Sequence, residues 1–161
     1  MKNLNIYYIS EDYINYLRQF DNKVVYNKKE KRPYVGIVYV YNGINYFVPL
    51  HSPKEKHLRI NSKALDVFKI NDGKLGIINI NNMIPAPKEV LKEALPTIND
   101  IKYKNLLENQ LTFINNNKKK LYSKINIFQN RYRKGYLNDA ILNRTCDFIL
   151  LEEKMKEYKQ I

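Results

Sequence analysis

Residues 34–48 read YVGIVYVY-NG-INYFV, in which Asn42 and Gly43 separate two runs rich in β-branched and aromatic residues. Such residues favour strands, and an Asn-Gly pair between two of these runs is the preferred two-residue turn of a β-hairpin. The pattern therefore predicts an antiparallel hairpin, with its first strand over residues 34–41 and its second over residues 44–48.

Neighbouring segments predict further strands. Residues 6–9 form a short apolar and aromatic run that predicts a strand. Residues 21–33 form a polar loop that leads into the first hairpin. Residues 65–70 and 75–80 flank a turn over residues 71–73, which predicts a second hairpin.

Prolines mark the expected limits of the sheet. Pro49 and Pro53 lack the N–H group that a strand ladder needs, so we expect the sheet to end, or to lie at an edge, after the first hairpin. Residues 83–87 contain two more prolines and are expected to end the sheet region.

Helical spacing of apolar residues appears near the start of the chain and throughout its C-terminal half. Ser10 can cap a helix in which apolar residues recur from Tyr13 to Phe20. Three further helices are predicted over residues 101–116, 118–134 and 145–159. The apolar stripe of the last helix comprises Phe148, Leu151, Met155 and Tyr158. With no linker or repeat, we predict one α+β domain over residues 1–161, a compact antiparallel sheet packed by C-terminal helices.

Composition limits the class of partner. The chain has 28 Lys and Arg against 16 Asp and Glu, a net charge of +12, and 14 tyrosines. Such a chain attracts phosphates, and tyrosines among lysines suit single-stranded nucleic acid. Cys146 is the only cysteine, which excludes an internal disulfide and fits a reducing cytoplasm. No segment is long enough to span a membrane, so we expect a cytoplasmic protein with neither a membrane nor a disulfide partner.

Residues 49–57 read PLHSPKEKH and directly follow the first hairpin. They bring together one hydroxyl, two imidazoles and two ammonium groups, in Ser52, His51, His57, Lys54 and Lys56. Cleavage of RNA through its own 2′-hydroxyl needs a base, an acid for the leaving group and positive charge beside the phosphate oxygens. Since loops at the end of a sheet often carry chemistry, this segment predicts a metal-independent endoribonuclease.

Residue types indicate how the roles divide. His51 and His57 are the only side chains whose ordinary pKa lies near neutrality, so either is a candidate titrating partner. Ser52 and Lys54 lie two positions apart and would point to the same side of an extended segment. The candidate charge stabilisers are Lys54, Lys56 and Arg32.

Alternatives remain open on the residues alone. Ser52 could hydrogen-bond its own loop backbone, and the lysines could form a solvated face of a non-catalytic RNA-binding protein. A two-metal nuclease would need folding to gather Asp12, Asp21 and Glu55. A Ser-Lys hydrolase could use Ser52 and Lys54, but the S-x-x-K context is missing. Without metal-ligand spacing or a glycine-rich phosphate loop, we predict no metal and no other cofactor.

Further basic residues occur as three runs. As solvated faces they need no explanation, but together they could line a groove for a folded RNA. With Lys56, the candidate RNA-binding residues are Lys28, Lys29, Lys31, Lys118, Lys119, Lys120, Arg131, Arg133 and Lys134.

Four motifs are spread over nearly the whole chain. They are YIS at residues 8–10, PLHSPK at residues 49–54, LGIIN at residues 75–79 and LLEEK at residues 150–154. Together they resemble those of the type III toxin–antitoxin toxins, the endoribonucleases of the ToxN/AbiQ kind.

This resemblance implies a compact, highly twisted antiparallel sheet related to the SH3-like barrel of other ribonuclease toxins. It implies metal-independent cleavage of single-stranded, adenine-rich RNA, including mRNA, to leave a 2′,3′-cyclic phosphate. It also implies an antitoxin made of repeated pseudoknot RNA, which the toxin trims and which inhibits it in a closed toxin–RNA ring. The outcome would be phage defence by abortive infection.

Roles within the site follow from the same resemblance. In such toxins the loop serine and lysine carry catalysis, which assigns those roles to Ser52 and Lys54. His51 stands where a hydroxyl residue often precedes the serine, and Arg32 stands where a lysine often contributes. Arg32 can fork onto phosphate but is a poor proton donor, so His51 is a candidate for the missing acid–base role. Two further family positions near the site match Tyr13 and His57.

Overall fold

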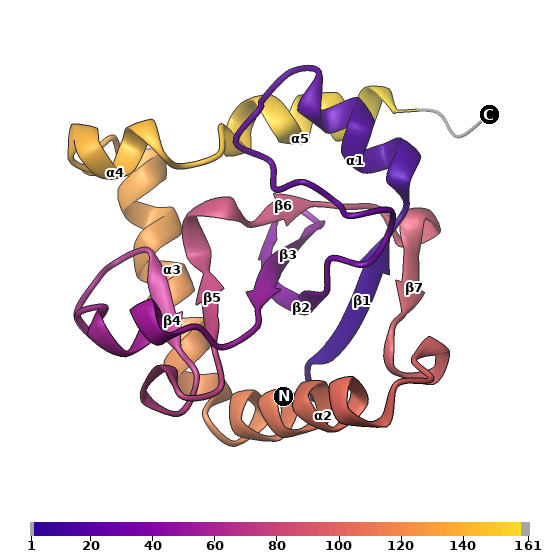
Figure 1. Ribbon diagram of the computed structural model, residues 1–161. Helices are drawn as coiled ribbons and strands as arrows, with labels where there is room; N and C mark the ends of the chain where they lie inside the picture. Colours follow the sequence, from indigo (N-terminus) through magenta and orange to yellow (C-terminus); the bar gives the residue numbers. More distant parts are fainter. Residues whose placement is uncertain (1, 159–161) are drawn as a thin grey trace.

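The computed structural model describes residues 2–158, which form an antiparallel sheet with helices around it (Figure 1). The strands are β1 (Asn5–Ile9), β2 (Tyr34–Tyr41), β3 (Ile44–His51), β4 (Val67–Lys69), β5 (Ile77–Asn79), β6 (Ile84–Pro85) and β7 (Leu91–Glu93). Their order is β4-β5-β3-β2-β1-β7, and β6 pairs with β3. No pairing between β4 and β7 is found in the described residues, so the sheet stays open.

Five α-helices are described, α1 (Glu11–Arg18), α2 (Ile101–Asn116), α3 (Lys118–Lys134), α4 (Asp139–Asn143) and α5 (Phe148–Glu157). Helix α3 packs on β2, and α5 packs on β6 and α1. The side chains of α3 that enter the core are Leu121, Ile125 and Phe128. Ser10 caps α1 as predicted, because its Oγ accepts from the Tyr13 N–H at 3.2 Å. No helix of the described chain is both long and apolar enough to cross a membrane.

The predicted first hairpin is present, and its register contains an irregularity. Asn42 (φ +49°) and Gly43 (φ +79°) are both left-handed, as the tight turn between Tyr41 and Ile44 requires. A bulge between Gly36 and Tyr39 then shifts the pairing by two residues, so that Gly36 lies opposite Phe47 instead of Pro49. Beyond the bulge, Tyr34 pairs with Pro49.

The expectation that the sheet ends or has an edge at Pro49 was wrong. Strand β3 continues to His51 and lies inside the sheet, with β2 on one side and β6 and then β5 on the other. The Leu50 N–H donates to the Pro33 carbonyl on the β2 side, so the Pro49 nitrogen faces the opposite side. There the partner changes from β6 to β5, which explains why no donor is needed at this residue.

Other boundaries differ in the shortest elements. The sheet does not end at residues 83–87, since β6 lies there and β7 follows and pairs with β1. Helix α4 was not predicted, and α5 is shorter than the predicted 145–159, whose last residue lies outside the described part. The predicted stripe on α5 is confirmed, with Phe148 and Leu151 in the core and Met155 and Tyr158 against it. Strands of two or three residues carry too little alternation for a pattern to appear.

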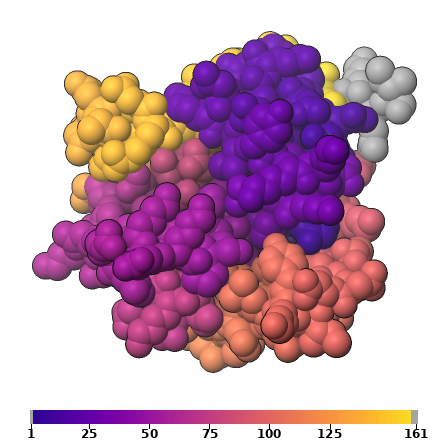
Figure 2. Space-filling model, viewed as in Figure 1, coloured from indigo at the N-terminus to yellow at the C-terminus, as the bar shows by residue number. Residues whose placement is uncertain are grey.

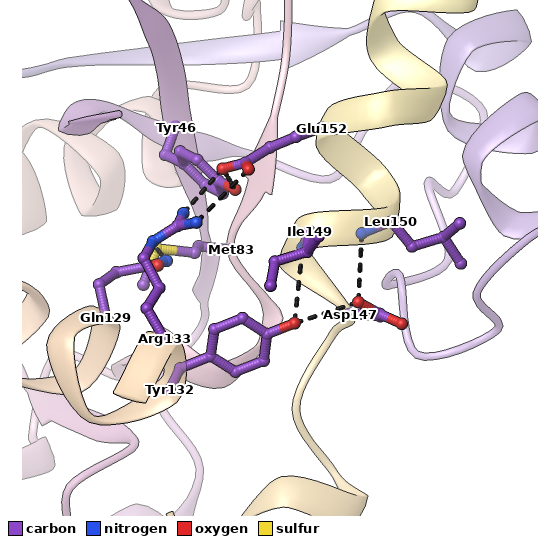
Figure 3. A network of polar contacts seen from close by, with 9 residues as sticks. All are labelled: Tyr46, Met83, Gln129, Tyr132, Arg133, Asp147, Ile149, Leu150 and Glu152. Atoms are coloured by element: carbon purple, nitrogen blue, oxygen red, sulfur yellow. Dashed lines mark hydrogen bonds and ion pairs between the residues drawn. The ribbon is translucent and has the colours of Figure 1, made fainter. Parts of the chain in front are cut away.

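A buried ion pair joins α3, α5 and β3 (Figure 3). Arg133 Nη2 lies 2.7 Å from Glu152 Oε2, which also accepts from the Tyr46 hydroxyl at 2.5 Å. The guanidinium lies 3.6 Å from the centre of the Tyr41 ring. The prediction of Arg133 as an RNA-binding residue was therefore wrong, because its charge and its planar face are both used inside the fold.

Removing one partner of a buried ion pair leaves the other charge buried without a partner. We expect Arg133→Ala to lower the free energy of unfolding by about 3–5 kcal/mol, measured by urea denaturation of the RNA-free protein. The matched control is Arg131→Ala, an exposed arginine of the same helix, which should change it by less than about 0.5 kcal/mol. Equal effects of the two variants would contradict this account of Arg133.

Candidate active site

The hairpin register places His51 in the candidate site. Extending the pairing of Tyr34 with Pro49 by two residues sets Arg32 opposite His51. On the other side, His51 pairs with Ile77 of β5, so Asn79 is its diagonal neighbour on the same face. Arg32 Nη1 lies 3.2 Å from His51 Nδ1, and the Asn79 carboxamide lies 3.0 Å from His51 Nε2.

These contacts determine the state of the imidazole. A guanidinium can only donate, so Nδ1 of His51 must accept from Arg32, and the ring proton is on Nε2. The Asn79 atom that faces Nε2 is the amide nitrogen Nδ2, and a half-turn of the carboxamide, which exchanges its nitrogen and oxygen in the same place, lets Oδ1 accept from Nε2–H. Burial, followed by the nearby charge of Arg32, lowers the pKa of His51 to about 4. His51 is therefore neutral at physiological pH.

His57 organises the backbone of Lys54. It lies in the 3-10 segment η1 (Glu55–Arg59), is 2% exposed, and its Nδ1 accepts from the Lys54 N–H at 3.1 Å. The His57 N–H donates to the Lys54 carbonyl at 2.9 Å. Burial, and then the charges of Lys56 and Lys54, lower the pKa of His57. The expectation that an imidazole titrates near neutral pH is thus corrected for His51, whereas for His57 the pKa is lowered from its ordinary value.

A cationic hollow of about 420 Å³ lies beside these imidazoles, and we call it the imidazole hollow. Its lining residues are Arg32, His51, Lys54, Lys56, His57, Ile60, Val67, Ile77 and Asn79. No acidic residue is among these described residues, so the positive charge there has no carboxylate to neutralise it. Such a hollow favours an anion of phosphate size.

Ser52 lines an adjacent hollow of about 600 Å³, here called the serine hollow. It lies where the loop before β2, the segment after β3 and the approach to α2 meet, and these segments adjoin on the face shown in Figure 2. Its lining residues are Tyr8, Lys28, Lys29, Glu30, Lys31, Ser52, Lys92, Thr97, Ile98, Asn99, Asp100 and Tyr103.

The two hollows are neighbours along two chain segments. Lys31 and Ser52 line the serine hollow, whereas the adjoining Arg32 and His51 line the imidazole hollow. Ser52 and Lys54 are both exposed but line different hollows, which differs from the expected common side. The physical reason is that β3 ends at His51 and η1 begins at Glu55, so the intervening residues do not continue an extended strand.

The lysines of the serine hollow are carried by a strained turn. Lys28, Lys29 and Glu30 have φ values of +50°, +56° and +66°, which costs about 1–2 kcal/mol per non-glycine residue. The Asn27 carbonyl accepts from the Lys31 and Arg32 N–H groups, each at 3.1 Å. The Glu30 carboxylate accepts from the Glu11 N–H at 3.0 Å, which ties the turn to the start of α1.

Tyr13 does not lie at either hollow. Its side chain is 0% exposed on the inner face of α1, and its hydroxyl donates to the Pro85 carbonyl at 2.7 Å. Burial raises the pKa of Tyr13 far above its ordinary value. Tyr13, which the resemblance placed near the site, is therefore a buried residue of the core that lines neither hollow.

The remaining basic residues are not gathered with the site. Lys118, Lys119 and Lys120 line a separate hollow at the junction of α2 and α3, where Lys118 also contacts Asn3. Arg131 and Lys134 are exposed in the last turn of α3, about 20 Å away along the helix axis. One groove formed by all three basic runs is not what the structure shows.

Several lining residues were missed by sequence reasoning. Asn79 could have been found, because it is a polar residue two positions after Ile77 in a strand and so shares its face. Lys92, Tyr8 and Tyr103 come from three elements whose proximity no local pattern reveals.

Glu30 and Asp100 line the serine hollow, but among the described residues they belong to no cluster of metal ligands. Within residues 2–158, no three His, Cys, Asp or Glu side chains are grouped as metal ligands. Asp21, one of the carboxylates considered for a metal nuclease, accepts instead from the backbone N–H groups of Lys23 and Asp147.

Fold and site define a basic α+β protein with adjoining cationic hollows, suited to a phosphodiester chain. Residues 5–156 match the family model described as toxin ToxN, type III toxin-antitoxin system. The chain is 36% identical to endoribonuclease ToxN of Bacillus thuringiensis subsp. kurstaki, over 94% of this chain and 82% of that protein. It is 32% identical to endoribonuclease AbiQ of Lactococcus lactis subsp. lactis, over 98% of this chain and 90% of that protein.

Solved structures agree with these relatives. One, from work on selective toxin inhibition by a non-coding RNA pseudoknot, superimposes with a TM-score of 0.82 at 36% identity, covering 99% of this chain and 100% of the other. The structure of AbiQ, described as a lactococcal anti-phage endoribonuclease, gives a TM-score of 0.81 at 27% identity, covering 98% of each chain. This protein belongs to the ToxN family of type III toxin–antitoxin systems.

The lowered pKa of His51 has a consequence for stability. Because the folded-state pKa is about 4 and the ordinary value is 6.5, the unfolded chain binds more protons between these pH values. The contribution of His51 is thus complete above about pH 6.5 and is lost as the pH falls towards 4. We expect His51→Gln to show a smaller drop in unfolding free energy across this window than wild type, by urea denaturation. Identical slopes would contradict the lowered pKa.

Proposed function

We propose that this protein is the endoribonuclease toxin of a type III toxin–antitoxin system. It cleaves single-stranded, adenine-rich RNA by metal-independent transesterification, leaving a 2′,3′-cyclic phosphate. The observation that carries this proposal is the imidazole hollow, which offers a guanidinium, two ammonium groups and two imidazoles without a carboxylate in its lining. The ToxN and AbiQ relatives, named as endoribonucleases, support it.

The reaction requires three events around one phosphorus atom. The 2′-hydroxyl loses its proton and attacks, the bond to the 5′-oxygen breaks, and that oxygen takes up a proton. Arg32 and Lys54 stabilise the negative charge on the non-bridging oxygens. Ser52 orients the scissile phosphate or relays a proton, and the serine hollow receives the adjoining nucleotide. Because their pKa values are lowered, His51 and His57 are neutral and hold other groups at neutral pH. The proton of the 2′-hydroxyl passes to solvent water, and the ammonium group of Lys54 gives a proton to the departing 5′-oxygen.

An RNA partner is part of the proposal. A relative's structure comes from work on toxin inhibition by an RNA pseudoknot, and another comes from work on a processed non-coding RNA that regulates an antiviral system. We infer that a repeated pseudoknot RNA, trimmed by the toxin, occupies both hollows and closes a toxin–RNA ring. Release of the toxin on infection would cleave cellular and phage RNA in the cytoplasm and abort phage growth.

The fold supports a finer assignment. We infer that the open, bulged sheet is a relative of the SH3-like barrel and that residues 1–161 act as one domain. The half-buried Lys118 and the exposed Lys119, Lys120, Arg131 and Lys134 would contact a folded antitoxin instead of the scissile strand.

Cleavage in EDTA tests the activity directly. We expect the purified protein to cut an adenine-rich oligonucleotide in EDTA and to leave cyclic-phosphate ends, and expect Ser52→Ala or Lys54→Ala to lower the rate by about 10²-fold or more. The control is Lys120→Ala, an exposed lysine outside both hollows. Binding without cleavage would support a non-catalytic RNA-binding protein, and loss of cutting in EDTA would support a metal nuclease.

Salt dependence tests whether the strained turn contacts RNA. In a Ser52→Ala background, Lys28→Ala should make the slope of log K against log salt shallower by about 0.7, the value for one phosphate contact on a single strand. A short oligonucleotide and fluorescence anisotropy suffice for the measurement. Lys120→Ala should leave the slope unchanged, and equal slopes for Lys28→Ala and wild type would remove Lys28 from the proposed path.

A further inference from the structure

The arginine at the imidazole hollow is held differently from two other arginines of the protein. Arg133 and Arg144 are each paired with a carboxylate, Glu152 and Asp66 respectively. Arg32 has no carboxylate within ion-pair distance among the described residues, and its side chain contacts the neutral ring of His51. Its Nε is buried and has no partner.

A neutral acceptor and a carboxylate do different things to a guanidinium. Both fix its orientation, but a carboxylate also neutralises its charge, whereas a neutral imidazole leaves the charge available to a bound phosphate. The hollow that Arg32 lines contains no acidic side chain. Holding Arg32 through His51 therefore combines a fixed geometry with an undiminished positive charge.

His51 can act in this way in only one of its two neutral tautomers. With the proton on Nδ1, the ring would present N–H to a group that only donates, and the contact with Arg32 would be lost. Arg32 selects this tautomer, and Asn79 supports it, because a half-turn of the carboxamide whose Nδ2 lies 3.0 Å from Nε2 lets its oxygen accept from Nε2–H. Asn79 is itself fixed in β5, whose pairing with β3 and β4 sets its position.

We propose that Asn79 and His51 are positioning residues which hold Arg32, as an unneutralised guanidinium, in the place where it meets the scissile phosphate. This inference rests on the proposed ribonuclease function and adds to it how its charge stabiliser is set. Asn79 acts through His51, and His51 acts through Arg32; neither contacts the substrate.

We call the chain of contacts from Asn79 through His51 to Arg32 the clamp. The surroundings of His51 make its neutral form essential to this clamp. The charged and titratable groups that face it are Arg32 and Lys28 from the loop before β2, and Lys54 and His57 from the segment after β3. All of these are basic, and the groups from β5 and α2, Asn79 and Gln110, are uncharged. An imidazolium at this position would be repelled and would release Arg32.

The first test changes the partner of Nε2. Asn79→Ala removes this partner, so the His51 ring can adopt either neutral tautomer. We expect kcat to fall by about 10²-fold with a smaller change in KM. Asn82→Ala, which removes a nearby asparagine bonded to the Lys23 carbonyl, is the matched control and should leave kcat unchanged. In an Arg32→Ala background, Asn79→Ala should add little further loss, since it acts through Arg32.

The second test makes the imidazolium easier to form. Asn79→Asp is isosteric but places a carboxylate on Nε2–H, which raises the pKa of His51. Its kcat/KM should then fall as the pH drops below neutrality, whereas wild type shows no such loss above about pH 5. A profile parallel to that of wild type would overturn the clamp.

A spectroscopic readout does not depend on activity. In 15N-labelled Ser52→Ala protein at pH 7, the His51 ring should show a bare Nδ1 and a protonated Nε2, and Asn79→Ala should convert it to a tautomer mixture. His57, held by the Lys54 N–H, is the internal control. If wild type does not cleave RNA, the proposed function fails while this readout still tests the clamp. If wild type cleaves and the Asn79 variants match it in rate, the clamp fails alone.

Discussion

Everything at the candidate site depends on the register of the β2–β3 hairpin. The left-handed turn at Asn42 and Gly43 starts the pairing, and the bulge after Gly36 then shifts it by two residues. Without that shift, Arg32 would lie opposite Pro53 instead of His51. Successive side chains of a strand point to alternate faces of the sheet, so a shift of two residues leaves every side chain on its original face. The shift changes only which residues of β2 and β3 lie opposite one another. The hydrophobic core therefore tolerates the bulge, and the site is built by it.

The protein treats buried and surface charge in opposite ways. In the core, Arg133 is paired with Glu152 and stacked on Tyr41, so its charge is used for the fold. At the imidazole hollow, basic groups gather without an acidic residue in the lining, which destabilises the free protein through mutual repulsion and favours a bound polyanion. Burial lowers the pKa values of His51 and His57, and the surrounding positive charges lower them further, so that neither imidazole adds another charge. The arrangement suits a protein whose partners, in the proposed function, are all RNA.

Local patterns predicted the elements that local physics controls. The turn at Asn42-Gly43, the Ser10 cap and the bounds of α2 and α3 follow from turn geometry, capping and helical periodicity. The failures have a common cause in tertiary context. Pro49 is tolerated inside the sheet because its nitrogen faces the change of partner strand, β7 exists because β1 offers it a ladder, and Tyr13 and Arg133 look like functional residues but are satisfied by the core.

The sequence by itself determined the kind of chemistry, since the net charge, the residues of the PLHSPKEKH segment and the family motifs all point to RNA and to phosphate. It also determined the hairpin that carries this segment. Only the tertiary structure decided which groups face one another: Arg32 on His51, His51 on Asn79, and Ser52 in a hollow beside that of Lys54. The physical reason is that residue type sets what a group can do, while cross-strand register and burial set its partners, its pKa and its tautomer, and no local pattern encodes these.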